Sequence, residues 1–65
     1  MDREYVDSSM ITSIGYDEAT CTLEVEFKNG VVWQYHDFPE YMWYEFRSAE
    51  SKGKYFHANI REQFT

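Results

Sequence analysis

The stretch CTLEVEFKNGVVWQYH, residues 21–36, decides the fold of this 65-residue chain. In its first half, apolar and polar side chains alternate at every second position, which is the period of a strand with one buried face. The apolar members are Cys21, Leu23, Val25 and Phe27. Asn29-Gly30 follows, a strong signal for a β-hairpin, and Val31–His36 forms the returning strand. The stretch therefore predicts two antiparallel strands joined by a tight turn.

The length of the hairpin loop decides which side chains share a face of the sheet. A two-residue turn at Asn29-Gly30 would pair Phe27 with Val32 and place the aromatic residues of the returning strand beside the acids of the first. A three-residue loop over residues 28–30, with its glycine in the left-handed conformation, pairs Phe27 with Val31 instead. This second register gathers the apolar residues on one face, and the pattern favours it. It makes two aromatic residues structural members of the core: Trp33 and Tyr35.

The rest of the chain extends this hairpin in both directions. Upstream, residues 1–7 predict a loose lead-in, Ser9–Tyr16 predicts another strand that ends at the turn-prone residues 17–20, and Gly15 suggests a bulge. Downstream, a helix is predicted over Pro39–Ala49, with Asp37 favouring its start, and a second over Lys54–Gln63 after a break at Ser51-Lys52-Gly53. The residues expected to face the sheet are Met42, Trp43, Phe46 and Ala49, then Phe56, Ile60 and Phe64.

These elements predict an α+β fold. It consists of a three-stranded antiparallel β-meander followed by two helices packed on one sheet face, in a single domain over residues 1–65. A chain this short has little room for a core, and its aromatic content of 20% supplies large buried side chains. Pairing with a second copy would add further burial, so a homodimer is compatible with the composition.

The sequence also indicates the cellular compartment of the protein. One cysteine cannot form an internal disulfide, and no basic segment followed by an apolar run marks a secretory signal. No apolar segment approaches the roughly 20 residues that cross a bilayer. The sequence therefore predicts a cytoplasmic protein without a membrane span.

Charge is distributed unevenly along the chain. The net charge of −6 argues against a protein that binds nucleic acid mainly by neutralising phosphates. Residues 1–45 carry two cations against ten acids, whereas residues 46–65 carry four cations against two acids. The last third is locally basic, and a polyanion would bind there. Its candidate binding residues are Ser51, Lys52, Lys54, Tyr55, His57 and Arg61.

No pattern in the chain predicts catalysis or a cofactor. Cys21 alternates with the core residues of its strand, and a buried lone cysteine is ordinarily inert. His36 and Asp37 are adjacent strand residues and would point to opposite faces. Cysteine and histidine also lack the close paired spacings of a zinc site. We therefore expect no catalytic residue, no metal site and no cofactor.

With these residues laid out, the chain resembles the KTSC domain, a module found at the C-terminus of some lysyl-tRNA synthetases and as small stand-alone bacterial proteins. The landmarks are Val6, Ser8-Ser9, Ile14-Gly15-Tyr16, Leu23–Phe27, Asn29-Gly30, Trp33-Gln34-Tyr35, Phe38-Pro39, Ala49-Glu50-Ser51, Gly53–Phe56 and Ile60. The family's central tyrosine, any residue, tyrosine pattern has Trp33 in its first position here. The family often has asparagine where this chain has His57. The resemblance implies a small stand-alone bacterial or phage-type protein and suggests RNA binding through the attachment to a tRNA synthetase.

Two hypotheses follow. The first is a non-enzymatic module that binds RNA, including tRNA, or single-stranded nucleic acid through the basic C-terminal third, in the manner of single-strand binders. The second is a protein-interaction or self-associating module that uses exposed aromatic residues and has no role with nucleic acid. Their salt dependence separates them, because cation-mediated RNA binding weakens as salt rises whereas an aromatic protein interface changes little.

Overall fold

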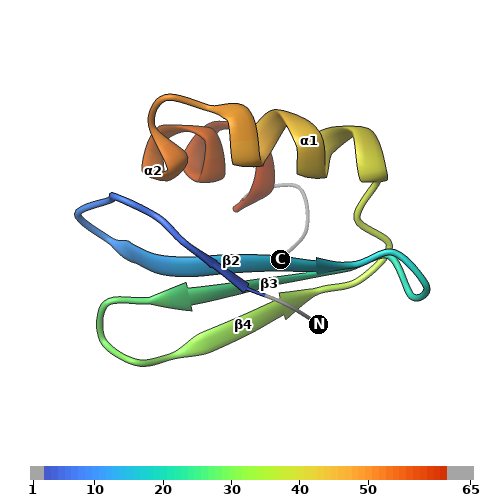
Figure 1. The fold of residues 1–65 in the computed structure, drawn as a ribbon, viewed down its shortest axis with the longest axis horizontal. Helices are drawn as coiled ribbons and strands as arrows, with labels where there is room; N and C mark the ends of the chain where they lie inside the picture. Colours follow the sequence, from blue (N-terminus) through green and yellow to red (C-terminus); the bar gives the residue numbers. More distant parts are fainter. Residues whose placement is uncertain (1–2, 62–65) are drawn as a thin grey trace.

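A computed structural model of the chain describes residues 3–61. Over these residues an antiparallel sheet of four strands, in the order β1-β2-β3-β4, carries a helical layer on one face (Figure 1). This confirms the predicted α+β class, the antiparallel sheet and the two helices. The elements are β1 Arg3–Tyr5, β2 Ile11–Asp17, β3 Thr22–Phe27, β4 Val32–Tyr35, α1 Glu40–Ser48, α2 Lys52–Tyr55 and one π-helical turn, η1 Phe56–Ile60. No helix within residues 3–61 is long and apolar enough to cross a membrane.

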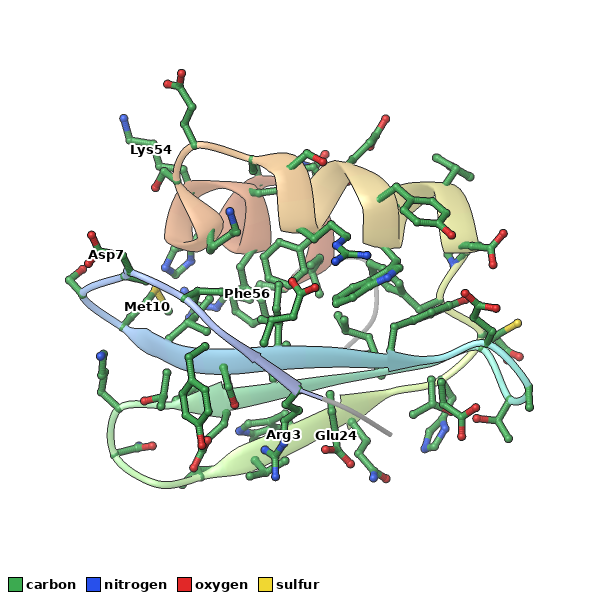
Figure 2. The ribbon with its side chains drawn as sticks, in the orientation of Figure 1. Arg3, Asp7, Met10, Glu24, Lys54 and Phe56 are labelled. Atoms are coloured by element: carbon green, nitrogen blue, oxygen red, sulfur yellow. The ribbon has the colours of Figure 1, made fainter. Side chains whose placement is uncertain are left out.

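The prediction of three strands is wrong, because a fourth strand lies in the segment predicted to be a loose lead-in. β1 pairs antiparallel with β2, with Arg3 opposite Gly15. Arg3 reaches across the sheet to the carboxylates of Glu24 (3.5 Å) and Glu26 (3.8 Å), and Figure 2 shows Arg3 and Glu24 on the face away from the helices. A three-residue strand is too short to show a periodicity of its own. It pairs with the next strand of the chain across a connection of five residues, residues 6–10, which contains no tight-turn signal.

The β3–β4 hairpin adopts the favoured register. Phe27 N–H donates to Val31 O at 2.9 Å, Gly30 has a φ of 90°, and Val25 lies opposite Trp33. The three-residue loop with a left-handed glycine is therefore confirmed. Leu23 and Val25 are fully buried on the face that the helices cover.

Only one of the two aromatic residues of β4 is in the core. Tyr35 is 3% exposed, whereas Trp33 is 54% exposed, so the prediction of a core role for Trp33 is wrong. Both side chains lie on the helical side of the sheet, as the register requires. β4 is the outermost strand, and the helical layer does not extend over the Trp33 position. The hairpin register correctly predicted the face of the sheet on which Trp33 lies. Its burial depends on whether the helices cover that position, and they do not.

The start of β3 also differs from the predicted pattern. Cys21 has a φ of 54° and is exposed, because the chain turns there and the strand begins one residue later at Thr22. The prediction that Cys21 belongs to the core is therefore wrong. The predicted bulge at Gly15 is wrong too: Gly15 pairs regularly with Glu24, and the irregularity in β2 lies between Ile11 and Ser13.

Helix α1 covers the sheet as its pattern predicts. Met42, Trp43 and Phe46 are buried, while Tyr41 and Tyr44 are exposed. The core around them also contains Ile11, Ile14, Leu23, Val25, Tyr35, Phe38, Phe56 and Ile60.

The prediction that Asp37 caps the start of α1 is wrong. Pro39 takes the N-cap position, and no side chain caps the helix. Asp37 has a φ of 57° and lies in the connection between β4 and α1.

The second helix starts earlier than predicted. Ser51 is its N-cap and accepts a hydrogen bond from Lys54 N–H at 3.3 Å, so Lys52 and Gly53 lie within the first turn of α2 and do not end a helix. Serine is a preferred N-cap residue, and here that preference outweighs the helix-breaking tendency of glycine. A Cβ on Gly53 would lie 3.3 Å from Met10 Sδ, so the glycine lets α2 approach the β1–β2 connection. Phe56 and Ile60 are buried as predicted, whereas Gln63 and Phe64 lie outside the described residues.

Candidate nucleic-acid interface

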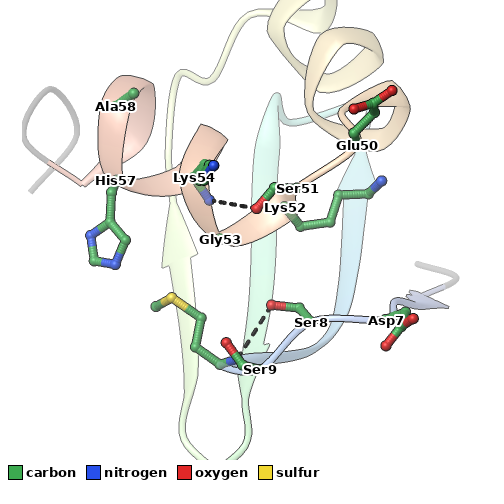
Figure 3. Close-up of a pocket in the computed structure, with 11 residues that line it drawn as sticks. Asp7, Ser8, Ser9, Glu50, Ser51, Lys52, Gly53, Lys54, His57 and Ala58 are labelled. Carbon is green, nitrogen blue, oxygen red and sulfur yellow. Dashed lines mark hydrogen bonds between the residues drawn. The ribbon is translucent and has the colours of Figure 1, made fainter.

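A polar hollow of about 710 Å³ lies between the β1–β2 connection and helix α2 (Figure 3). Four of the six predicted binding residues line it: Ser51, Lys52, Lys54 and His57. The other lining residues are Asp7, Ser8, Ser9, Met10, Glu50, Gly53 and Ala58. The fold thus brings most of the predicted set together, because these residues follow one another over a single short helical segment.

Short-range hydrogen bonds shape the two walls of the polar hollow. On one wall, Ser8 Oγ accepts from the backbone N–H groups of Met10 and Ile11, both at 3.3 Å. On the other, Ser51 caps α2, and Lys52 Nζ donates to the carbonyl of Ala49. These contacts hold the backbone on both sides, so the hollow is bounded by ordered segments.

The charge in the polar hollow differs from the charge of the sequence segment. Lys52 and Lys54 line the same hollow as Asp7 and Glu50, so the formal charges of these four side chains sum to zero. Figure 2 shows Asp7 and Lys54 at the same end of the molecule. The basic excess of the last third is a property of the linear sequence. Folding places Asp7, from the acidic part of the chain, beside the lysines and removes that excess locally.

Tyr55, the fifth candidate, is not among the residues that line this hollow. Its ring stacks on Phe46 with centroids 5.4 Å apart, and its hydroxyl donates to Glu45 Oε1 at 2.7 Å. Burial, followed by this hydrogen bond and the Glu45 charge, raises the pKa of Tyr55 well above its usual value. The contacts of Tyr55 therefore tie α2 to α1.

Arg61, the sixth candidate, lines a second hollow of about 270 Å³, here called the aromatic hollow. Its other lining residues are Met10, Phe27, Trp33, Tyr35, Phe56 and His57. The Phe56 ring is in edge contact with two other lining rings, those of Phe27 at 5.3 Å and Tyr35 at 5.9 Å. Among the described residues that line it, none is acidic. The exposed Trp33 thus stands in an apolar groove whose one permanent charge among these residues is the guanidinium of Arg61.

The polar hollow and the aromatic hollow adjoin one another. Met10 and His57 line both, and His57 Nδ1 lies 3.3 Å from Arg61 Nη1. Together, the polar and aromatic hollows are called the paired hollows below. Sequence reasoning found their polar part but assigned Trp33 to the core. Recognising Trp33 as an exposed site residue requires knowing that β4 lies at an edge of the sheet.

The other potentially reactive side chains lie elsewhere. His36 Nδ1 is 3.4 Å from Thr22 Oγ1, and Cys21 Sγ is 4.0 Å from the carbonyl oxygen of Glu18. Within residues 3–61, no group of three or more His, Cys, Asp or Glu side chains is arranged to hold a metal ion.

Comparison with known proteins identifies the family. The profile of the KTSC domain matches residues 7–64. The chain belongs to the KTSC domain family. The match begins after β1, so the family landmarks could not reveal that strand. This KTSC domain superposes on the crystal structure of a KTSC domain protein from Yersinia pestis with a TM-score of 0.94 and 41% sequence identity, over 98% of this chain and 90% of that one.

Sequence relatives of this KTSC domain are of two sizes. An uncharacterised protein of Stutzerimonas stutzeri is 33% identical over 63 residues, which cover 97% of this chain and 89% of the relative. A lysine–tRNA ligase of Nostoc sp. is 38% identical over 58 residues, which cover 89% of this chain. The chain spans about a tenth (10%) of the length of that ligase. The same domain therefore occurs in small proteins and as part of a much larger enzyme.

Proposed function

We propose that this KTSC domain is a binding module that holds a short segment of single-stranded RNA across the paired hollows. The observation that carries the proposal is the position of Trp33, which is 54% exposed in an apolar groove beside Arg61. An unstacked base can lie on an exposed indole ring, and base–aromatic stacking is a main source of affinity in single-strand binders.

The cations around the paired hollows fit the phosphates of such a segment. With one base on Trp33, Arg61 lies in the same aromatic hollow, His57 lines both hollows, and Lys52 and Lys54 line the polar hollow. Arg3 and Arg47 line neither hollow and pair with carboxylates elsewhere on the molecule. The net charge of −6 opposes tight, non-specific binding of a long polyanion, so we expect a local contact with few phosphates.

The similarity to part of a lysine–tRNA ligase supports RNA as the ligand class. That support comes by association, since the matched segment is a small share of the ligase. We also propose that the domain acts by binding alone. In support, Cys21 Sγ contacts the carbonyl oxygen of Glu18, and His36 Nδ1 contacts the hydroxyl of Thr22.

Tryptophan fluorescence provides the test. A short single-stranded RNA is titrated at low salt into the wild-type protein and into Trp33→Ala, which retains only the buried Trp43. Stacking on Trp33 should quench the wild-type emission, and Trp33→Ala should bind about 5- to 150-fold more weakly, the equivalent of about 1–3 kcal/mol for one stacked base. A DNA of the same sequence shows whether the 2′-hydroxyl contributes.

Tyr41→Ala is the matched control, because Tyr41 is 65% exposed and lines neither hollow. It should bind RNA as the wild type does. Absence of quenching at low salt, or equal affinity of Trp33→Ala and wild type, would rule out a stacking site at Trp33.

A further inference from the structure

The outer side of β4 is an apolar sheet edge that no described strand covers. Val31, Val32 and Trp33 are 44%, 42% and 54% exposed. The segment from Val31 to Tyr35 contains no charged residue and no proline. Natural proteins usually protect a sheet edge with charges, prolines or bulges, because unpaired backbone groups recruit other strands. An edge without these devices is suited to pairing.

The opposite edge of the same sheet has the expected protection. β1 is three residues long, and two of them, Arg3 and Glu4, are charged. Arg3 pairs with Glu24 and Glu26, and Glu4 pairs with Arg47. The two edges of the sheet therefore differ, and the unprotected one is β4.

The hairpin register identifies which backbone groups of β4 face outward. Phe27 N–H donates to Val31 O, so these two residues form a hydrogen-bonded pair. Such pairs alternate along an antiparallel ladder, which directs the N–H and C=O of Trp33 and Tyr35 toward β3. The backbone groups of Val32 and Gln34 point to the free edge.

We propose that β4 pairs antiparallel with β4 of a second copy of this chain, about a two-fold axis at Trp33. In this register, Val32 of each copy exchanges backbone hydrogen bonds with Gln34 of the other, and the two Trp33 residues lie opposite each other. In this register the segment from Val31 to Tyr35 of one copy overlaps fully with the same segment of the other. Because Trp33 lines the aromatic hollow, the pairing sets the two aromatic hollows side by side across the axis.

Charges near the edge agree with this pairing. The nearest carboxylates on the sheet, Glu24 and Glu26, belong to β3, so those of the two copies are three strand spacings apart, roughly 14 Å. That separation exceeds the screening length of about 8 Å at physiological ionic strength. The same register brings exposed Lys28 of each copy toward exposed Asp37 of the other. The interface thus avoids like charges and places opposite charges at its ends.

The mass of the protein in solution tests the proposal. Light scattering over a wide range of protein concentration should give twice the chain mass of 7.9 kDa for the wild type. Gln34→Pro removes one outward N–H, which the monomer does not use, and should give the monomer mass. Gln34→Ala is the matched control: it removes the side-chain hydrogen bond to Glu24 but keeps the backbone N–H, and should stay dimeric. Val32→Lys changes an exposed position of the same edge and should also be monomeric. It replaces Gln34→Pro in the test if the proline variant does not fold.

The proposal is overturned by a wild-type protein that is monomeric throughout, by a folded Gln34→Pro variant that stays dimeric, or by a monomeric Gln34→Ala variant. Raising salt should maintain or strengthen the dimer, since each copy carries a net charge of −6. RNA binding should weaken with salt, so the two proposals fail separately. Gln34→Pro keeps Trp33, and its RNA affinity shows whether one copy is enough for binding.

Discussion

Raising the salt concentration tests the charge of the proposed RNA site. Among the described cations, Lys52, Lys54 and Arg61 line the paired hollows. For single strands, each phosphate contact contributes about −0.7 to the slope of log K against log salt, so these three cations predict a slope of about −2. Between about 50 and 200 mM salt, the affinity for single-stranded RNA should therefore fall by about 20-fold.

Removing one cation from the paired hollows should change this slope by a defined amount. In Lys54→Ala two contacts remain, and the same increase in salt should lower the affinity by only about 7-fold. Lys28→Ala is the matched control, because Lys28 is an exposed lysine in the β3–β4 loop and lines neither hollow. Its slope should equal that of the wild type. The double variant Lys52→Glu with Lys54→Glu should lose most of the binding.

Fluorescence anisotropy of a labelled single-stranded RNA, repeated at several salt concentrations, measures these slopes. A slope near zero would contradict the proposed phosphate contacts and favour an aromatic protein interface, whose affinity depends little on salt. Equal effects of Lys28→Ala and Lys54→Ala would show that the cations act through net charge alone. Intact binding in the double glutamate variant would remove the polar hollow from the site.

Two predictions concern the stability of the fold. Phe46→Ala should destabilise the protein by about 3–5 kcal/mol, as measured by urea unfolding, because the fully buried ring stacks on Tyr55 and its loss leaves a cavity; a loss below about 1 kcal/mol would contradict this packing. Burial, followed by interactions with Cys21, raises the pKa of Tyr16 to about 12, and its hydroxyl donates to the carbonyl of Phe38. The folded state then keeps a proton that the unfolded state loses near pH 10, so stability should fall as pH rises from 10 to 12, and less steeply in Tyr16→Phe. Equal pH dependence of wild type and Tyr16→Phe would refute the assignment.

Local sequence patterns predicted much of the candidate site but not the residues that distant parts of the chain contribute to it. Ser51, Lys52, Lys54 and His57 follow one another closely, so any helical conformation of this segment keeps them near one another. Asp7 and Trp33 come from distant parts of the chain, and no spacing rule links them to that segment. Asp7 removes the expected positive charge of the polar hollow, and Trp33 adds the aromatic surface of its neighbour.

The sequence by itself determined the hairpin and its register. Strict alternation in residues 22–27 favours the register with a three-residue loop ending in Gly30, because only that register gathers the apolar side chains on a single face, and the structure adopts it. Those interactions are local, so they do not depend on the positions of the other elements. Only the tertiary structure decided that β1 joins the sheet and that Trp33 remains exposed. Pairing of β1 depends on β2 and on Glu24 and Glu26, and the burial of Trp33 depends on how far the helical layer extends over β4.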